Sequence, residues 1–354
     1  MGLKILHTAD LHLDSPFAAF PEAARERLRA AQLRLPELLV SACRREGADI
    51  LLLAGDVFDG PYRKSTARAL ADALEDCAVP VFFAPGNHDF YASGAPWQQE
   101  LWPENVHIFT GNMSYVDLEA LDCRVYGAGY TSMDCPGLLE GFRAERVFAH
   151  TLAVLHGDPL NAKSPYCPVT ARQVENSGLD YLALGHIHKG GSLTAGGTLC
   201  AWPGCPMGRG WDETGRKGLL LAELGDKATL RTLALPLPAF WEETVSIEPG
   251  AAQALSAVLP AAAAEDFYRV TLTGRGEVAL DALKEQFSYL PGLELRDRTL
   301  PRLDPWENAG QDSFRGLYFT LLKEKLSNPE LADAAQLAAE LSQKILDGEE
   351  VALP

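Results

Sequence analysis

The stretch Asp49-Ile50-Leu51-Leu52-Leu53-Ala54-Gly55-Asp56-Val57-Phe58-Asp59 places a glycine and two carboxylates directly after a continuous apolar run. Such a run predicts a strand that is buried on both faces, as in a parallel sheet. A glycine after the strand lets the backbone turn sharply. We therefore expect Asp56 to be presented at the carboxyl end of a buried strand.

The same arrangement returns in four more motifs, each of which follows a short apolar run. They are Asp10-Leu11-His12, Gly86-Asn87-His88-Asp89, His156-Gly157-Asp158 and Gly185-His186-Ile187-His188. Because ligands bind beyond the carboxyl ends of strands in open α/β sheets, we expect one face of one sheet to gather all five motifs into one site. The turn preference of glycine, aspartate and asparagine explains any single motif, but it does not explain why histidine recurs in four of the five.

The first two thirds of the chain alternate strand-like and helix-like segments, which predicts an α/β fold. Predicted strands are Lys4–His7, Asp49–Ala54, Val81–Ala84, Val106–Phe109, Tyr115–Leu118, Cys123–Tyr126, Leu152–Leu155 and Tyr181–Leu184. Predicted helices are Glu22–Glu46, broken or kinked at Pro36, and Ser65–Asp76, with a serine cap. Glycine spacing after residue 190 predicts hairpins.

A boundary is predicted near Leu235-Pro236-Leu237-Pro238. Beyond it, strands at 243–248, 267–272 and 293–296 and helices at 251–264 and 278–290 suggest a small α+β cap domain. Two amphipathic helices are expected at 313–326 and 329–346. The predicted division is therefore 1–238, 239–304 and 305–354.

Bulk properties restrict the class of protein. The formal net charge is −17, so the overall field does not attract nucleic acid. No apolar run approaches the roughly 18 residues that a membrane-spanning helix needs. The chain holds seven cysteines and no Cys-x-x-Cys, which favours reduced thiols over a disulfide frame or a zinc ribbon. We expect a cytoplasmic protein without a membrane segment.

Together the motifs supply carboxylates, imidazoles and one amide, a set that suits Mn, Fe or Zn. Two divalent ions about 4 Å apart can clamp a phosphoryl group and activate water. Asp56 is the candidate for a carboxylate shared by both ions. Asp10 and His12 lie two residues apart on a segment expected to be extended, so they can chelate one ion, and His186 and His188 repeat that spacing.

The third motif supplies residues with other roles. Asn87 offers a neutral oxygen ligand. His88 follows it and has no partner two residues on, so it suits a general acid or a phosphate contact. Asp89 is expected to hold the other nitrogen of His88. Asp59 is expected to orient a ligand or to close its loop.

The motif set D-x-H, G-D-x-x-D, G-N-H-D, H-G and G-H-x-H resembles the calcineurin-like metallophosphoesterase superfamily. The opening His7-Thr8-Ala9-Asp10-Leu11-His12-Leu13-Asp14-Ser15-Pro16-Phe17 resembles the SbcD and YhaO-type DNA repair exonucleases. Asp14 stands where the SbcD branch usually has glycine, which shifts the resemblance toward the YhaO branch. Trp202-Pro203-Gly204-Cys205-Pro206 is similar to the end of that nuclease domain.

This resemblance implies two mixed sheets in a sandwich flanked by helices, with Mn as the usual metal and Fe, Zn or Mg as alternatives. It assigns one metal to Asp10, His12, Asp56 and His188, and the second to Asp56, Asn87, His156 and His186. His88, with Asp89, carries the catalytic role. The resemblance implies DNA, an SbcC-like ATPase subunit and a homodimer as partners. The apolar stripe of the first predicted C-terminal helix, which includes Phe314, Leu317 and Leu321, fits either docking of such a partner or packing on the cap domain.

Two other functions stay open. A small-molecule or nucleotide phosphodiesterase could use the same scaffold, and the acidity favours it. A non-catalytic scaffold could dock a partner through the C-terminal helices, although buried ionisable clusters are costly without metal. Arg63, Lys64 and Arg68 are candidates for phosphate contacts. Arg209, Arg216 and Lys217 lie in a glycine-rich loop that could face the site.

Overall fold

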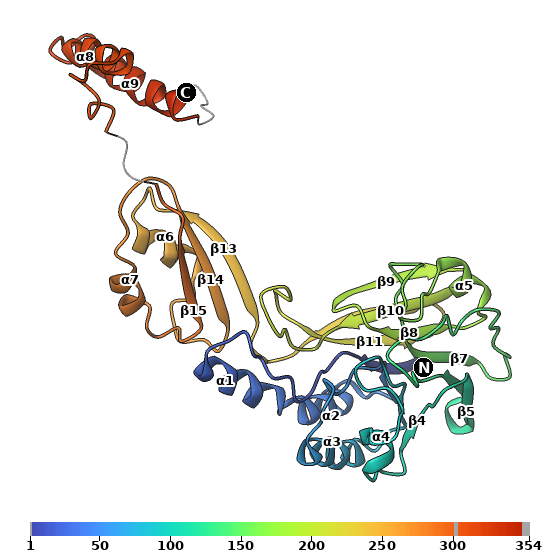
Figure 1. Cartoon of the computed structure of the whole chain (residues 1–354). Coiled ribbons are helices and arrows are strands. Elements are labelled where there is room, and N and C mark those ends of the chain that lie inside the picture. Colours follow the sequence, from blue (N-terminus) through green and yellow to red (C-terminus); the bar gives the residue numbers. More distant parts are fainter. Residues whose placement is uncertain (1, 301–303, 349–354) are drawn as a thin grey trace. The chain divides into compact units, whose positions relative to one another are not determined.

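The structure is a computed structural model that describes residues 2–300 and 304–348 (Figure 1). Residues 301–303 of the predicted cap and 349–354 of the predicted C-terminal segment lie outside the described residues. The chain divides into two compact units. The first holds residues 1–242 with 265–267, and the second holds 243–264 with 268–354.

The first unit contains two mixed sheets. One has the order β12 (Ala228–Ala234), β11 (Gly218–Leu224), β1 (Leu3–Thr8), β2 (Ile50–Leu53), β3 (Val81–Phe83) and β4 (Val106–Ile108). The other has the order β5 (Ser114–Leu118), β6 (Cys123–Gly127), β7 (His150–His156), β8 (Tyr181–Gly185), β10 (Thr198–Gly204) and β9 (Lys189–Ala195). In the first sheet β1, β2, β3 and β4 run parallel, and β11 is antiparallel to both β1 and β12. In the second sheet the four inner strands run parallel, and the edge strands β5 and β9 are antiparallel to their neighbours.

The two sheets pack face to face, because strand residues alternate between two sides. Ile5 and Leu52 lie in one buried cluster with Val125 and Leu152 of the second sheet. Leu6, on the opposite face of β1, lies in a second cluster with residues of α1 (Glu22–Gln32), α2 (Leu35–Glu46) and α3 (Lys64–Cys77). A third cluster covers the outer face of the second sheet and includes Val174 of α5 (Ala171–Asn176). The predicted sandwich of two mixed sheets flanked by helices is therefore confirmed.

The two early helices differ in detail from their predictions. The expected break in the first helical segment is present, but it falls at Leu33 and Arg34, between α1 and α2. Pro36 lies in the first turn of α2, where a missing N–H costs little.

The prediction that a serine caps the N-terminus of α3 is wrong. Ser65 lies inside α3 and is no cap. Asp14, from the loop after β1, accepts hydrogen bonds from the backbone N–H of Arg63 at 2.7 Å and the hydroxyl of Thr66 at 2.8 Å. A carboxylate at this end is favoured by the helix dipole. The N-terminus of α3 is thus capped by a residue distant in sequence.

The remaining short elements of the first unit are α4 (Pro96–Gln99) and a 3₁₀ turn at Glu119–Leu121. Trp97 of α4 is buried in the core on the helix side of the first sheet. Among the described residues, no helix is both long and apolar enough to cross a bilayer.

The second unit contains a sheet of order β13 (Phe240–Ser246), β14 (Phe267–Thr273) and β15 (Leu293–Asp297), with α6 (Ala251–Val258) and α7 (Leu280–Gln286). The predicted β-α-β-α-β order is present, although both helices are shorter than predicted. Pro260 ends the first, because the residue before a proline disfavours helical geometry. Further along are α8 (Phe314–Lys325) and α9 (Ala332–Leu346). The predicted domain division at 238 and 304 stays a prediction.

Candidate metal centre

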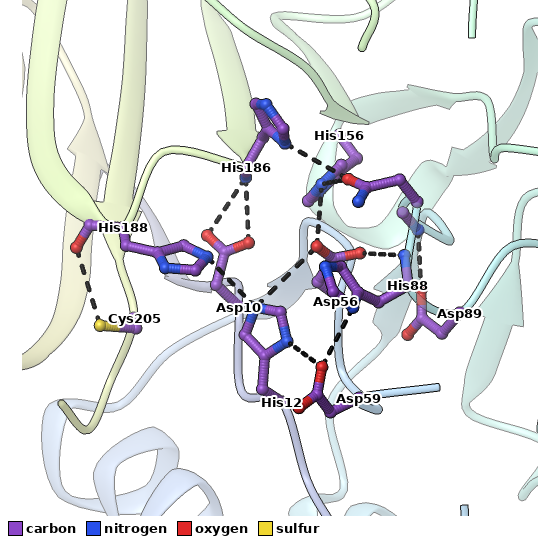
Figure 2. Close-up of polar contacts among 12 residues, drawn as sticks. Asp10, His12, Asp56, Asp59, His88, Asp89, His156, His186, His188 and Cys205 are labelled. Atoms are coloured by element: carbon purple, nitrogen blue, oxygen red, sulfur yellow. Dashed lines mark hydrogen bonds and ion pairs between the residues drawn. The ribbon is translucent and has the colours of Figure 1, made fainter. Parts of the chain in front are cut away.

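The five motifs meet where the carboxyl ends of strands from both sheets come together (Figure 2). The first three motifs follow β1, β2 and β3 of one sheet. His156 ends β7, and His186 and His188 follow β8, in the other sheet. The expectation that one sheet would gather all five motifs is therefore wrong, because each sheet supplies part of the site.

Glycines let the two sheets approach this closely. A Cβ on Gly185 would lie 1.9 Å from the Ala54 carbonyl oxygen, across the two sheets. A Cβ on Gly86 would lie 2.2 Å from Asp56 Oδ1. These two glycines are therefore needed for close packing as well as for turns, because a side chain at either position would push ligand-bearing segments apart.

A buried histidine also joins the sheets. His7 of β1 lies 2.8 Å from the Tyr181 hydroxyl and 3.1 Å from the Leu184 carbonyl, both on β8. It is fully buried, and burial lowers its pKa to about 3. His7 is thus a buried core histidine with a partner for each ring nitrogen.

Several of the predicted ligands have left-handed backbone conformation. The φ angles are 52° for Asp10, 45° for His12, 51° for Asp56 and 85° for His186. The expected extended geometry of the first motif is therefore wrong. Backbone hydrogen bonds hold the turn, because the N–H of Asp10 donates to Gly55 O at 3.0 Å and that of His12 donates to Asp56 O at 2.9 Å. Such outliers persist only where the surroundings enforce them, and they gather at functional sites.

The predicted ligands converge. Three groups have ligand atoms within 4.8 Å of one another: Asp10, His12 and His188; Asp10, Asp56 and His156; and His12, Asp56 and His88. The remaining two predicted ligands are beside them, since the Asn87 side-chain oxygen lies 3.0 Å from His156 Nε2 and 3.3 Å from His186 Nδ1. All seven predicted ligands therefore lie in one cluster, and their metal-binding role stays a prediction.

The hydrogen-bond partners of the Nδ1 atoms show that the other ring nitrogen, Nε2, of these histidines faces the centre of the cluster. His156 Nδ1 lies 2.8 Å from the Ala54 carbonyl oxygen, and His188 Nδ1 lies 2.6 Å from Glu213 Oε1. An oxygen acceptor at this distance requires a proton on Nδ1, so the neutral ring keeps its lone pair on Nε2. His12 Nδ1 lies 3.3 Å from an Asp59 carboxylate oxygen, which favours the same tautomer.

The inward Nε2 atoms face other acceptors. His12 Nε2 lies 3.2 Å from His188 Nε2. His156 Nε2 lies 3.0 Å from Asn87 Oδ1 and 3.3 Å from Asp56 Oδ2. Lone pairs directed at one another repel unless positive charge lies between them. Divalent ions bound by imidazole and carboxylate meet this requirement, so the residues present fit a metal centre.

The electrostatics agree with this need for positive charge. Burial disfavours the Asp56 carboxylate, but the neighbouring His156 and His12 outweigh it and hold its pKa well below the usual range. Burial likewise disfavours the charged form of His156, yet Asp56 and Asp10 raise its pKa to about 10. In the metal-free chain, a proton on His156 therefore supplies the charge that the carboxylates require.

His88 is held by a different carboxylate from the one predicted. Its Nδ1 lies 3.0 Å from Asp59 Oδ1, and this hydrogen bond raises the pKa of His88. Asp89 instead accepts hydrogen bonds from the backbone N–H groups of Val57 at 2.7 Å and Gly86 at 2.8 Å. Burial raises the pKa of Asp89 to about 7. The predicted contact between Asp89 and His88 is thus corrected to Asp59, and a catalytic role for Asp89 stays a prediction.

The loop after β10 adds two residues to the site. Glu213, which no motif indicated, bonds His188, and Arg209 lies 3.3 Å from Glu213 and 3.8 Å from Asp59. The basic cluster at 209–217 pointed to this loop, but Arg216 pairs with Asp266, away from these ligands. Glu213 carried no local signal, because its role depends on a partner 25 residues away.

A pocket of about 410 Å³ opens beside His88. Its lining is mostly uncharged and includes Pro61, Tyr62, Phe90 and Pro96. This pocket offers space for an apolar or aromatic group next to the candidate general acid.

Comparison with known proteins agrees with this geometry. The chain is 34% identical over 239 residues to an uncharacterized metallophosphoesterase, YhaO, of Bacillus subtilis, covering 63% of this chain and 57% of that protein. It is 28% identical over 220 residues to the DNA double-strand break repair protein Mre11 of Aeropyrum pernix, covering 57% and 53%. The chain thus spans little more than half the length of these relatives.

Other matches carry different names. The chain is 28% identical over 232 residues to a UDP-2,3-diacylglucosamine hydrolase of Xanthomonas oryzae, covering 56% of this chain and 88% of that one. Among solved structures, TT1561 of Thermus thermophilus matches 66% of this chain and 99% of its own, at 14% identity and a TM-score of 0.42.

One family model, described as calcineurin-like phosphoesterase, matches residues 3–190. That range covers more than half of the chain and contains every candidate ligand described above. The chain therefore belongs to the calcineurin-like phosphoesterase family.

Proposed function

We propose that the chain is a two-metal phosphodiesterase that cleaves DNA, with Mn²⁺ as the activating ion. The observation that carries the proposal is the convergence of Nε2 lone pairs and carboxylates from both sheets at one point. When bound, two ions would stabilise charge on the phosphoryl group and lower the pKa of an attacking water.

The residues of the site would supply a shared carboxylate ligand and a general acid. Asp56 Oδ2 lies 3.3 Å from His156 Nε2 and 3.9 Å from His12 Nε2, two histidines assigned to different ions, which suits a carboxylate shared by both. The side chain of His88 is 43% exposed, so it can reach a bound substrate. Asp59 raises the pKa of His88 and so favours a protonated ring that can donate to the departing sugar oxygen.

Two observations support DNA as the substrate. One relative is described as a DNA double-strand break repair protein, and the chain resembles it over 220 residues. The pocket beside His88 is lined by Tyr62 and Phe90, and aromatic side chains are common stacking platforms for unpaired bases.

A second candidate substrate is a nucleotide-linked small molecule. The formal net charge of −17 does not favour a polyanionic substrate. The match to UDP-2,3-diacylglucosamine hydrolase covers 88% of that enzyme, a larger share than for the repair protein.

The test compares three substrates with the purified full chain in Mn²⁺: end-labelled linear DNA, UDP-2,3-diacylglucosamine and a chromogenic bis-aryl phosphodiester. His88→Ala serves as the matched control. We expect shortening of the DNA that disappears in the variant. Hydrolysis of the lipid nucleotide with intact DNA would refute the nuclease proposal and keep the two-metal site. No hydrolysis of any of the three would refute the phosphodiesterase itself.

We also propose that an SbcC-like ATPase docks on the α8–α9 segment. In α8, Phe314, Leu317 and Leu321 follow a helical stripe, and their side chains are exposed. Deleting the residues after Pro305 should abolish ATPase binding and leave hydrolysis of the bis-aryl diester unchanged. Retained binding would contradict this docking site. A homodimer and a cytoplasmic location stay predictions.

A further inference from the structure

The loop between β10 and β11 closes one side of the metal centre, although it lies beyond the region matched by the family model. Gly208 allows this closure, because a Cβ there would lie 2.6 Å from the Glu213 carbonyl oxygen. The backbone N–H of Glu213 donates to Gly210 O at 3.1 Å. The loop is therefore a compact turn that directs Glu213 inward.

Both carboxylate oxygens of Glu213 are occupied. Oε1 lies 2.6 Å from His188 Nδ1 and 3.3 Å from an Arg209 guanidinium nitrogen. Oε2 accepts from the backbone N–H of Arg209 at 2.7 Å and from the Cys205 thiol at 3.6 Å. The side chain is only 6% exposed, so this carboxylate is committed to partners within the loop and to His188.

Arg209 connects this loop to the opposite side of the centre. Its guanidinium lies 3.3 Å from Glu213 and 3.8 Å from Asp59 Oδ2. Asp59 in turn contacts His12 Nδ1 and His88 Nδ1 at 3.3 and 3.0 Å. The guanidinium therefore lies between the two carboxylates that contact the Nδ1 atoms of three site histidines, and it also lies 3.2 Å from His188 Nδ1 itself.

We propose that Glu213 is a positioning residue for the metal centre, holding His188 with Nε2 toward the ion, and that Arg209 locks Glu213 and Asp59 in place. The inference rests on the proposed two-metal function. A carboxylate behind a metal-bound histidine fixes its tautomer and orientation and strengthens it as a ligand. Glu213 is not in any of the candidate ligand groups and its carboxylate bonds His188, so it would act through His188.

The chain offers a matched pair of variants. Glu213→Gln removes the negative charge and keeps a side chain of similar size. Asp212→Asn makes the same charge change at the neighbouring residue, whose side chain is exposed. Any general effect of one lost charge in this loop should appear in both.

The measurement is calorimetric titration of the metal-free full chain with Mn²⁺, together with the visible spectrum of the Co²⁺ form. We expect the wild type to bind two ions and Glu213→Gln to bind one of them about 10- to 100-fold more weakly, with altered Co²⁺ absorption. Asp212→Asn should match the wild type.

Unchanged Mn²⁺ affinity and an unchanged Co²⁺ spectrum in Glu213→Gln would overturn the proposal, even if its melting temperature fell, because the contact would then be structural only. If that variant does not fold, the same Mn²⁺ titration is done with Arg209→Lys. Weaker binding of one ion would support the role of Arg209 in holding Glu213 and Asp59, and wild-type affinity would refute it. A wild type that binds no Mn²⁺ would refute the two-metal centre itself, which is a different failure.

Discussion

Replacing His7 by glutamine should remove a defined part of the acid sensitivity of the first unit. The imidazole takes up a proton in the unfolded chain below its ordinary pKa of 6.5, but in the fold only below about 3. Between these values the unfolded state binds more protons, so stability falls as the pH falls. Glutamine does not titrate, and it can still bond the Tyr181 hydroxyl and the Leu184 carbonyl.

The size of the effect follows from linkage. At pH 5 the buried imidazole is still neutral, whereas about 97% of unfolded chains carry the proton. Relative to pH 7.5, this difference costs the fold about 2 kcal/mol. His7 is fully buried, so solvent screening does not reduce the figure.

Urea unfolding at pH 7.5 and pH 5, followed by tryptophan fluorescence in a chelator, measures this difference. All tryptophans except Trp306 lie in the first unit, so the signal reports mainly on its unfolding. The wild type should lose about 2 kcal/mol more than His7→Gln between the two pH values. Equal losses would show that His7 is not held neutral between the sheets, and the reasoning would fail.

Three further outcomes are expected. His88→Ala should keep both ions by calorimetry but lower turnover by roughly 10²- to 10⁴-fold, whereas Asp56→Ala should lose metal and activity together; full activity in the His88 variant would contradict its role. Asp59→Asn should lower the pKa of His88, so the alkaline limb of the pH–rate profile should move to lower pH; an unmoved limb would exclude His88 as the acid. Gly185→Ala places a Cβ against the Ala54 carbonyl and should cost about 1–3 kcal/mol in urea unfolding; wild-type stability would show that the sheets can separate freely.

Local patterns in the sequence determined the strands and the chemistry they carry. A buried strand such as β2 is an apolar run, and its ligand follows a glycine, so both are visible within ten residues. The seven candidate ligands were recognisable for the same reason, since each stands at the end of a strand or within four residues of it. Helix limits were less certain, because capping can come from far away, as Asp14 caps α3.

Only the tertiary structure decided which residues support those ligands. The sequence indicated Asp89 as the partner of His88, but the turn after β2 brings Asp59 to His88, and Asp89 accepts hydrogen bonds from backbone amides instead. Glu213 reaches His188 only because the loop after β10 returns to the segment that follows β8. The candidate ligands can be recognised in short segments of sequence. The carboxylates that orient the histidines, Asp59 and Glu213, are set by the tertiary packing, which no short segment encodes.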